Sequence, residues 1–317
     1  MRIDFTFVPS AFASTDLAAQ PQSFYFDPER SDATLAELDD SVFTGVIVDD
    51  AGGLLTNIDL ASHAAQRTSG LRVDITHWAG LMSPSVAARQ LASLDQISGG
   101  RVSLRVLVDG LVDEEGGTID RHLNAWRRTD EYLVLLKRLL ANDQPFDYVG
   151  PFYRIHNGFV PKKGPSGFAI PIRMSGRSGT ALEVAGRHAD VFELPGVSPA
   201  ETRQFIERVR NAAAKRGRAG KIRFALPVRL DRADDPRRTT ADVIALPDLG
   251  HQAVSLLVDY VNAGVSEFMV TGTNEAALIR AFAEDVATPV RDTATREHAP
   301  LPSYTRNVGW LTRGRRA

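Results

Sequence analysis

Short apolar runs alternate with longer amphipathic stretches along most of the chain. The short runs are rich in β-branched and aromatic residues, which favour strands. They predict strands at residues 3–8, 45–48, 71–75, 102–108, 172–174, 191–194, 223–230 and 267–271. The longer stretches repeat apolar residues every three or four positions, which is the period of a helix with one buried face. They predict helices at residues 31–42, 58–66, 84–97, 120–141, 179–188, 200–216, 249–263 and 275–285.

Eight strand–helix units in succession favour a parallel sheet, and that number favours closure into a TIM (β/α)8 barrel. An open, doubly wound sheet is the alternative, because periodicity does not detect closure. One segment, residues 144–167, interrupts the alternation with Pro, Gly and aromatic residues, and it predicts a hairpin inserted after the fourth helix. We interpret residues 1–317 as one domain with a C-terminal tail over about residues 293–317.

Composition narrows the possible functions. The 317 residues are 43% hydrophobic and 24% charged with a formal net charge of -2, so the chain lacks the basic excess of nucleic-acid-binding proteins. Cysteine is absent, which excludes disulfides, thiolate metal ligands and a cysteine nucleophile. No apolar run approaches the roughly 20 residues that span a bilayer, and the histidines have no metal-ligand spacing. We expect a cytoplasmic protein with neither a nucleic-acid nor a membrane partner.

In a barrel, the functional site lies where the strands end. After the fifth strand comes Ser175-Gly176-Arg177-Ser178, directly before a helix. Two hydroxyl groups, an arginine and the free N–H groups of a helix start predict a cradle for an anion such as a phosphate. A purely structural interpretation has equal weight, in which Ser178 only caps the helix and Gly176 only makes the turn.

Other candidate residues follow neighbouring strands or begin a helix. His122 and Trp126 are four residues apart near the start of the fourth helix, and therefore on one face. They suit a phosphate and a ring, although packing is the commoner role of such a pair. His77 follows the third strand and is a candidate catalytic residue or a hydrogen-bonded rim residue. Asp49 and Asp50 follow the second strand and are candidate acid–base groups, or else capping and turn residues.

The segment from Ser83 to Arg101, SPSVAARQLASLDQISGGR, resembles the signature helix of the bacterial-luciferase-like flavin monooxygenases. It is most similar to the alkanesulfonate and nitrilotriacetate monooxygenase branch. Shorter matches follow in the same order along the chain: Leu107-Val108-Asp109-Gly110, Asp130-Glu131-Tyr132-Leu133, Gly150-Pro151-Phe152-Tyr153, Pro171 through Ser178, Lys221-Ile222-Arg223-Phe224 and Ala263 through Phe268. The long segment is specific, and the shorter ones gain weight because they are collinear.

The resemblance implies a TIM barrel that uses molecular oxygen and reduced FMN, supplied by a separate flavin reductase, on a small organic substrate. It places the FMN phosphate against Ser178, the neighbouring backbone and His122. Trp126 stands where the family has a tyrosine, so its N–H would replace the hydroxyl group with altered geometry. The resemblance also places Asp49 or Asp50 and Thr76 beside the isoalloxazine ring, and it implies a homodimer.

The chain departs from the alkanesulfonate enzymes at the seventh strand, where Pro227 and Arg229 replace their Arg-x-His pair. Their long loop before the last strand is also largely missing. Arg229 is a candidate catalytic residue that would bind an anionic substrate or stabilise the peroxide anion, or else a residue that forms a salt bridge at the rim. These departures argue against alkanesulfonate as the substrate. Two alternatives to a monooxygenase stay open. One is a deazaflavin-dependent dehydrogenase of the same superfamily, against which the resemblance to the sulfonate branch argues. The other is a non-catalytic flavin-binding protein, which these departures would fit.

Overall fold

The computed structural model describes residues 2–9, 28–49, 56–108, 118–230, 242–273 and 275–297. Its strands are β1 (Asp4–Phe7), β2 (Gly45–Val48), β3 (Arg72–Trp78), β4 (Val102–Leu107), β5 (Phe146–Val149), β6 (Arg154–Gly158), β7 (Ile172–Ser175), β8 (Val191–Glu193), β9 (Arg223–Arg229), β10 (Ile244–Ala245) and β11 (Glu267–Thr271). Its α-helices are α1 (Pro28–Asp39), α2 (Asn57–Arg67), α3 (Pro84–Ser98), α4 (Thr118–Ala141), α5 (Gly179–His188), α6 (Pro199–Ala214), α7 (His251–Ala263), α8 (Ala276–Phe282) and α9 (Thr288–Glu297).

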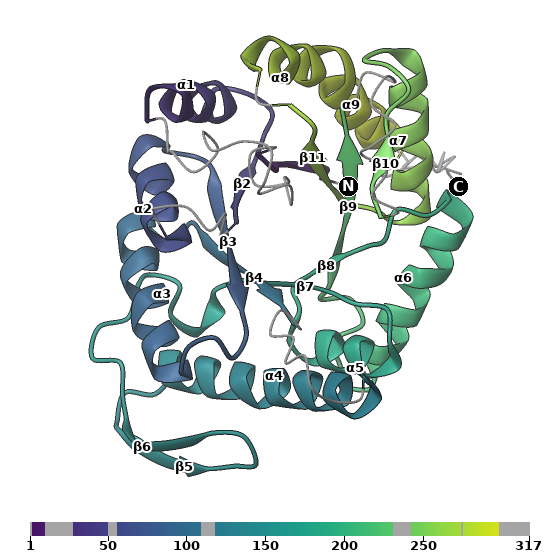
Figure 1. Ribbon diagram of the computed structural model, residues 1–317. Helices are drawn as coiled ribbons and strands as arrows, with labels where there is room; N and C mark the ends of the chain where they lie inside the picture. The colour runs from purple at the N-terminus through teal and green to yellow at the C-terminus, as the bar shows by residue number, and fades with distance from the viewer. Residues whose placement is uncertain are drawn as a thin grey trace, which may run out of the picture.

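The predicted barrel is confirmed. Parallel strands follow the order β9-β11-β1-β2-β3-β4-β7-β8, and β8 also pairs with β9, so the sheet closes on itself. Figure 1 shows the closed ring of strands surrounded by helices. The short strand β10 pairs with the carboxyl end of β9, at Val228 and Arg229. Closure excludes the open, doubly wound sheet.

The hairpin predicted after the fourth helix is also present. β5 and β6 pair antiparallel and project away from the barrel beside α4 (Figure 1). Glu131 of α4 anchors the hairpin because its carboxylate accepts the N–H groups of Phe152 and Tyr153, the latter at 2.9 Å. Two of the short segments that resemble the flavin monooxygenases, residues 130–133 and 150–153, therefore contact each other.

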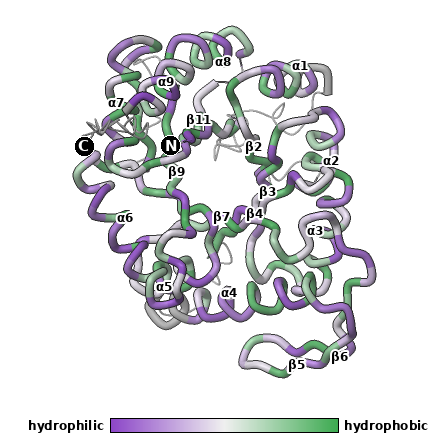
Figure 2. Tube along the Cα trace, turned by 180° about the vertical axis from the view of Figure 1, so that it is seen from behind, coloured by the Kyte–Doolittle hydropathy of each residue, from purple (hydrophilic) through white to green (hydrophobic). Residues whose placement is uncertain are grey.

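Strand residues alternate between two environments. On one face of β9, Phe224, Leu226 and Val228 belong to the large core between sheet and helices. On the other face, Ala225 joins a small apolar cluster inside the barrel. Figure 2 shows hydrophilic and hydrophobic segments alternating along the surrounding helices, as expected for helices with one buried face. None of the helices in the described ranges combines the length and apolar character that crossing a bilayer requires.

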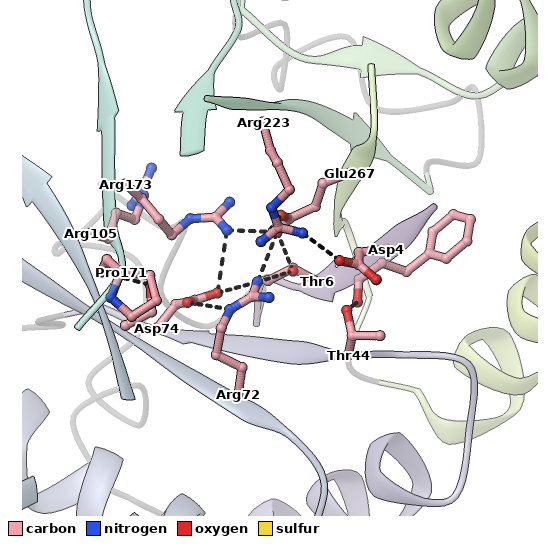
Figure 3. A network of polar contacts seen from close by, with 12 residues as sticks. Asp4, Thr6, Thr44, Arg72, Asp74, Arg105, Pro171, Arg173, Arg223 and Glu267 are labelled. Atoms are coloured by element: carbon pink, nitrogen blue, oxygen red, sulfur yellow. Dashed lines mark hydrogen bonds and ion pairs between the residues drawn. The ribbon is translucent and has the colours of Figure 1, made fainter. Parts of the chain in front are cut away.

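Charged side chains fill much of the barrel interior, where barrels commonly have apolar layers (Figure 3). Arg173 of β7 is fully buried, and its Nη1 lies 2.6 Å from Glu267 and 3.5 Å from Asp74. Arg72 of β3 donates to the same two carboxylates at 2.9 and 2.8 Å. Burial alone would raise the pKa of Glu267, yet Arg173 and Arg72 lower it to about 2. We call Arg72, Asp74, Arg173 and Glu267 the core tier.

The specific segment 83–101 has a structural explanation. Gly99 ends α3 in the left-handed conformation, with φ 64°. Arg101 then donates to carbonyl groups at and beyond the end of α2, reaching those of Ala65 and Leu71 at 2.7 Å each. The segment therefore joins α2, α3 and β4 into one unit.

Most element boundaries differ from those expected by one to three residues, the first helix for example spanning Pro28–Asp39 in place of 31–42, and two elements extend well past their predicted ends. β3 continues to Trp78 because Thr76, His77 and Trp78 pair in register with β4. The last predicted helix continues past residue 285, through a π-helical turn at Ala283–Ala287 and α9 to Glu297. Residues 293–297, expected in a tail, are helical, and Ala294 is fully buried against the core.

Candidate active site

The predicted anion cradle lies at the carboxyl end of β7, which is the catalytic face of a barrel. Ser175 is the last residue of β7, and Ser178 is the N-cap of α5. Gly176 between them has φ 146°, and a methyl group there would lie 2.6 Å from Cβ of Ala181 and 3.1 Å from Cζ2 of Trp126. Glycine is therefore required at this turn, because any side chain would collide with these neighbours.

The helix start in this cradle is open. Oγ of Ser178 accepts a hydrogen bond from N–H of Ala181 at 3.1 Å, so the expected capping role is present. The first N–H groups of a helix have no carbonyl partner within it, and those of Gly179 and Thr180 have no hydrogen-bond partner among the residues that the structure describes. A side chain at Gly179 would meet no atom within 4 Å. Capping and anion binding are compatible, because the cap uses the Ser178 oxygen as an acceptor and leaves its proton to donate.

The remaining cradle residues lie on different sides of the loop. Trp126 of α4 is buried, and its indole ring covers Gly176. Arg177 is 59% exposed and forms an ion pair with Asp242 on the surface. His122 belongs to α4, one helical turn before Trp126, but its side chain lies outside the described residues. The structure thus brings Trp126 to the cradle and directs Arg177 toward solvent.

A second polar cluster crosses the barrel interior at the same end. Asp49 directly follows β2, and its Oδ1 accepts hydrogen bonds from Oγ1 of Thr76 and, at 3.1 Å, from Nη1 of Arg105. Nε of Arg105 donates to both carboxylate oxygens of Glu193, at 2.9 and 3.1 Å. The side chains of Asp49 and Arg105 are each 20% exposed, whereas Thr76 and Glu193 are buried. We call Asp49, Thr76, Arg105 and Glu193 the mouth tier.

Sequence reasoning missed Arg105 and Glu193. Each is a single charged residue in an apolar run, Leu104-Arg105-Val106 and Phe192-Glu193-Leu194. A lone charge in a buried strand is the sequence feature that could have marked them as candidates. Burial would raise the pKa of Glu193, but Arg105 and Arg173 hold it below its ordinary value. Because Nε of Arg173 lies 3.2 Å from Glu193, this glutamate connects the mouth tier to the core tier.

His77 lies on the opposite face of β3 from Thr76, because side chains alternate along a strand. Its Nε2 lies 2.6 Å from the hydroxyl oxygen of Tyr132 in α4, and the two rings stack with centroids 5.5 Å apart. Burial lowers the pKa of His77 to about 4, so the ring is neutral at physiological pH. Of the two roles expected for His77, catalytic residue or hydrogen-bonded rim residue, this position fits the second. The ring lies between the sheet and α4.

Arg229 is the last residue of β9 and shares the interior-facing side of that strand with Ala225. It is half-buried, and its Cγ lies 3.0 Å from where a methyl group at Gly272 would be. Arg229 therefore lies at the rim, beside the end of β11. Asp50, the other acidic candidate, lies outside the described residues.

Comparison with known proteins decides the family. A family model described as luciferase-like monooxygenase matches residues 5–286. The chain belongs to this family. The FMNH(2)-dependent dimethylsulfone monooxygenase of Pseudomonas putida is 32% identical over 194 residues, which are 59% of this luciferase-like chain and 53% of that protein. The chain thus spans about half the length of this curated relative.

Solved structures share the fold of the luciferase-like chain at low sequence identity. A long-chain alkane monooxygenase has a TM-score of 0.76 at 14% identity, covering 92% of each chain. A coenzyme F420 dependent tetrahydromethanopterin reductase from Methanopyrus kandleri has a TM-score of 0.71 at 15% identity, covering 91% of this chain and 99% of the other. The barrel is therefore common to proteins whose names give different reactions.

Proposed function

We propose that this luciferase-like protein is a monooxygenase that uses reduced FMN and molecular oxygen to oxidise a small organic substrate. The observation that carries the proposal is the cradle after β7, where an open helix start faces the catalytic end of the barrel. The Pseudomonas putida relative, whose name specifies FMNH(2) and a monooxygenase, supports the same cofactor and reaction.

The cradle residues fit the terminal phosphate of FMN. The N–H groups of Gly179 and Thr180 and the hydroxyl group of Ser178 would donate hydrogen bonds to it. The dipole of α5 favours a negative charge at this position. His122, one turn before Trp126 on α4, would approach from the same side of the helix. Ser175 and Arg177 complete the loop, and Arg177 reaches the phosphate only if it leaves Asp242.

Other residues of the mouth would orient the ring and the substrate. When bound, reduced FMN supplies the electrons that activate oxygen, while the protein supplies orientation and excludes water. Trp78 and Leu107, paired at the ends of β3 and β4, are large apolar side chains suited to a dry wall. Arg229 would hold a polar group of the substrate at the rim. Asp49 and Thr76 of the mouth tier would contact the ring.

Flavin binding tests the proposal directly. Wild-type protein should bind FMN more tightly than riboflavin, which lacks the phosphate, and Ser178→Ala combined with His122→Ala should abolish that difference. Ser198→Ala is the matched control, because Ser198 caps α6 in the same way but lies outside the cradle. With reduced FMN, oxygen consumption should rise when a suitable small substrate is added. Failure to bind either oxidised or reduced FMN would remove the proposal.

The same assays distinguish the two alternatives. Tighter binding of a deazaflavin than of FMN, with hydride transfer and no oxygen uptake, would identify a dehydrogenase. Flavin binding without an oxygen-dependent product would identify a binding protein. We propose further that the enzyme acts in the cytoplasm as a homodimer supplied by a separate flavin reductase. Sedimentation analysis tests the homodimer, and coupling to a purified reductase tests the supply of reduced FMN.

A further inference from the structure

Three basic side chains lie together at the last turn of α5. The carbonyl group of His188, the last residue of α5, accepts a hydrogen bond from Nζ of Lys137 in α4 at 3.3 Å. The carbonyl group of Gly186 accepts one from Nη1 of Arg218 at 3.3 Å, and Arg187 lies between these two carbonyl residues in the chain. Because α5 begins at the cradle, its last turn lies toward the opposite end of the barrel. We call Lys137, Arg187 and Arg218 the basic cluster.

The carboxylates beside the basic cluster are bound to its arginines. Nη1 of Arg187 lies 2.7 Å from Asp130, and Nη2 of Arg218 lies 2.8 Å from Asp190. Each carboxylate also has one further hydrogen-bond partner, the imidazole of the last α5 residue for Asp130 and a backbone N–H group for Asp190. Lys137 forms no ion pair with any carboxylate of the described residues. Its amine is therefore the member of the cluster that no carboxylate holds.

Lys137 also lines a cavity of about 10 Å³, whose other walls are leucine, isoleucine and phenylalanine side chains. Phe168 is one of these walls and is 62% exposed, so the cavity lies next to solvent. Burial lowers the pKa of Lys137 below its ordinary value; the attraction of Asp190 opposes this only in part, and Arg218 and Arg187 add to it. A larger fraction of this amine is therefore uncharged near neutral pH, and the uncharged amine is the nucleophilic form.

We propose that Lys137 is a covalent modification site for small acyl phosphates, with Arg187 and Arg218 binding the phosphate group. The amine nitrogen attacks the acyl carbon, and the bond from that carbon to the bridging oxygen breaks. Inorganic phosphate leaves with one proton of the amine, and the lysine is left as an amide. A guanidinium group has five N–H donors, so both arginines can keep their carboxylates and still bind a phosphate.

The amide product suits this position in the fold. It is uncharged, and a half-buried site beside apolar walls favours an uncharged group over an ammonium ion. Its remaining N–H group can still donate to the carbonyl group of His188, so acylation of Lys137 keeps the contact between α4 and α5. The site needs neither the cradle nor a flavin.

The test treats wild-type protein with acetyl phosphate near neutral pH and measures acetylation of each lysine by mass spectrometry of peptides. Lys162 and Lys221 are the internal references, because both are exposed and neither forms an ion pair among the described residues. We expect Lys137 to react at least about threefold faster than either reference, because the two arginines concentrate the anionic donor beside it.

The pH dependence gives a second readout. The acetylation rate of Lys137 should reach half of its plateau at a lower pH than the rates of Lys162 and Lys221, since burial lowers its pKa. Burial also lowers the pKa of His188, and the hydrogen bond from His188 lowers that of Asp130 against the effect of burial. Neither of these two groups therefore changes charge in the alkaline range where lysines titrate.

Acetic anhydride is the comparison donor, because it is uncharged and carries no phosphate. Arg187→Gln and Arg218→Gln should each slow acetylation of Lys137 by acetyl phosphate about threefold or more, and by acetic anhydride much less. Arg187 is 42% exposed, so its variant should fold even if the Arg218 variant does not. Arg138→Gln is the matched control on α4, because Arg138 stacks on Phe146 of the hairpin, 3.9 Å from the ring centroid. It should leave both rates unchanged.

The outcomes are distinct. Reaction of Lys137 with acetyl phosphate that is no faster than that of Lys162 and Lys221 would overturn the inference. Equal slowing of both donors by Arg187→Gln would also overturn it, because the arginine would then act on the amine and not on a phosphate group. Faster reaction of Lys137 that depends on Arg187 only with acetyl phosphate would support it. None of these results depends on flavin binding, so the proposed function is tested separately.

Discussion

Replacing Arg173 with methionine tests how the core tier contributes to stability. Arg173 is fully buried and lies within 3.5 Å of three carboxylates, those of Glu267, Glu193 and Asp74. Methionine fills much of the same space without charge, so the variant leaves buried carboxylates without their shared cation. We expect a loss of about 3 to 5 kcal/mol in the free energy of unfolding at neutral pH, the usual effect of removing one partner of a buried ion pair.

The pKa of Glu267 sets the pH range in which the core tier stabilises the fold. Burial would raise this pKa, but Arg173 and Arg72 lower it from 4.5 to about 2. A shift of that size corresponds to about 3 kcal/mol. Because the folded pKa lies below the unfolded one, the stabilisation is present above about pH 4.5 and is lost as the pH falls toward 2. The difference between wild type and variant should therefore be largest near neutral pH and shrink in acid.

Urea unfolding at pH 7 and at successive pH values down to about pH 3, followed by circular dichroism, measures both effects. Arg280→Met is the control, because the exposed pair of Arg280 with Glu37 should contribute far less. Adding Glu267→Gln to the Arg173 variant should recover part of the loss, since it removes one uncompensated charge. An Arg173→Met protein as stable as wild type at pH 7 would refute the reasoning.

Three further predictions concern other parts of the molecule. Arg101→Ala should lower the free energy of unfolding by about 2 to 4 kcal/mol, because it removes several hydrogen bonds to carbonyl groups around the end of α2, as urea unfolding will measure. His77 should titrate near pH 4 by NMR, and since burial holds it neutral, stability should fall as the pH drops from about 6.5 toward 4. Glu131→Gln should speed amide exchange at Phe152 and Tyr153 while changing the melting temperature little, since Glu131 ties only the hairpin to α4.

The barrel could be predicted because each of its strands and helices is indicated by the pattern of residues within that element. The strand at 267–271 and the helix at 179–188 have the same bounds in sequence and structure, since apolar period and flanking residues define them. The sequence predicts that β3 ends at residue 75, because the next three residues, Thr76, His77 and Trp78, are polar or aromatic. Its extension depends on pairing with β4, and such a pairing cannot be read from one strand alone.

The residues of the candidate site also differ in whether local sequence predicts them or whether they depend on contacts between distant strands. The cradle from Ser175 to Ser178 is contiguous, so its residue types and the helix start after it predict an anion site. The mouth tier joins four strands, and Arg105 and Glu193 are 88 residues apart. Their contact depends on closure and register of the sheet. The direction of His77 is likewise fixed by the extension of β3, which places it outside the barrel interior.

The charges of the barrel interior are better understood as parts of the site than as a source of stability. Replacing a whole buried ion network by well-packed apolar residues is often neutral or stabilising, even though removing one partner is costly. An apolar interior would hold the strand ends by packing, which sets no direction for a polar group at the mouth. Here directional bonds run from Glu267 through Arg173 and Glu193 to Arg105. The network therefore fixes where a donor and an acceptor stand at the mouth, and packing alone does not supply that.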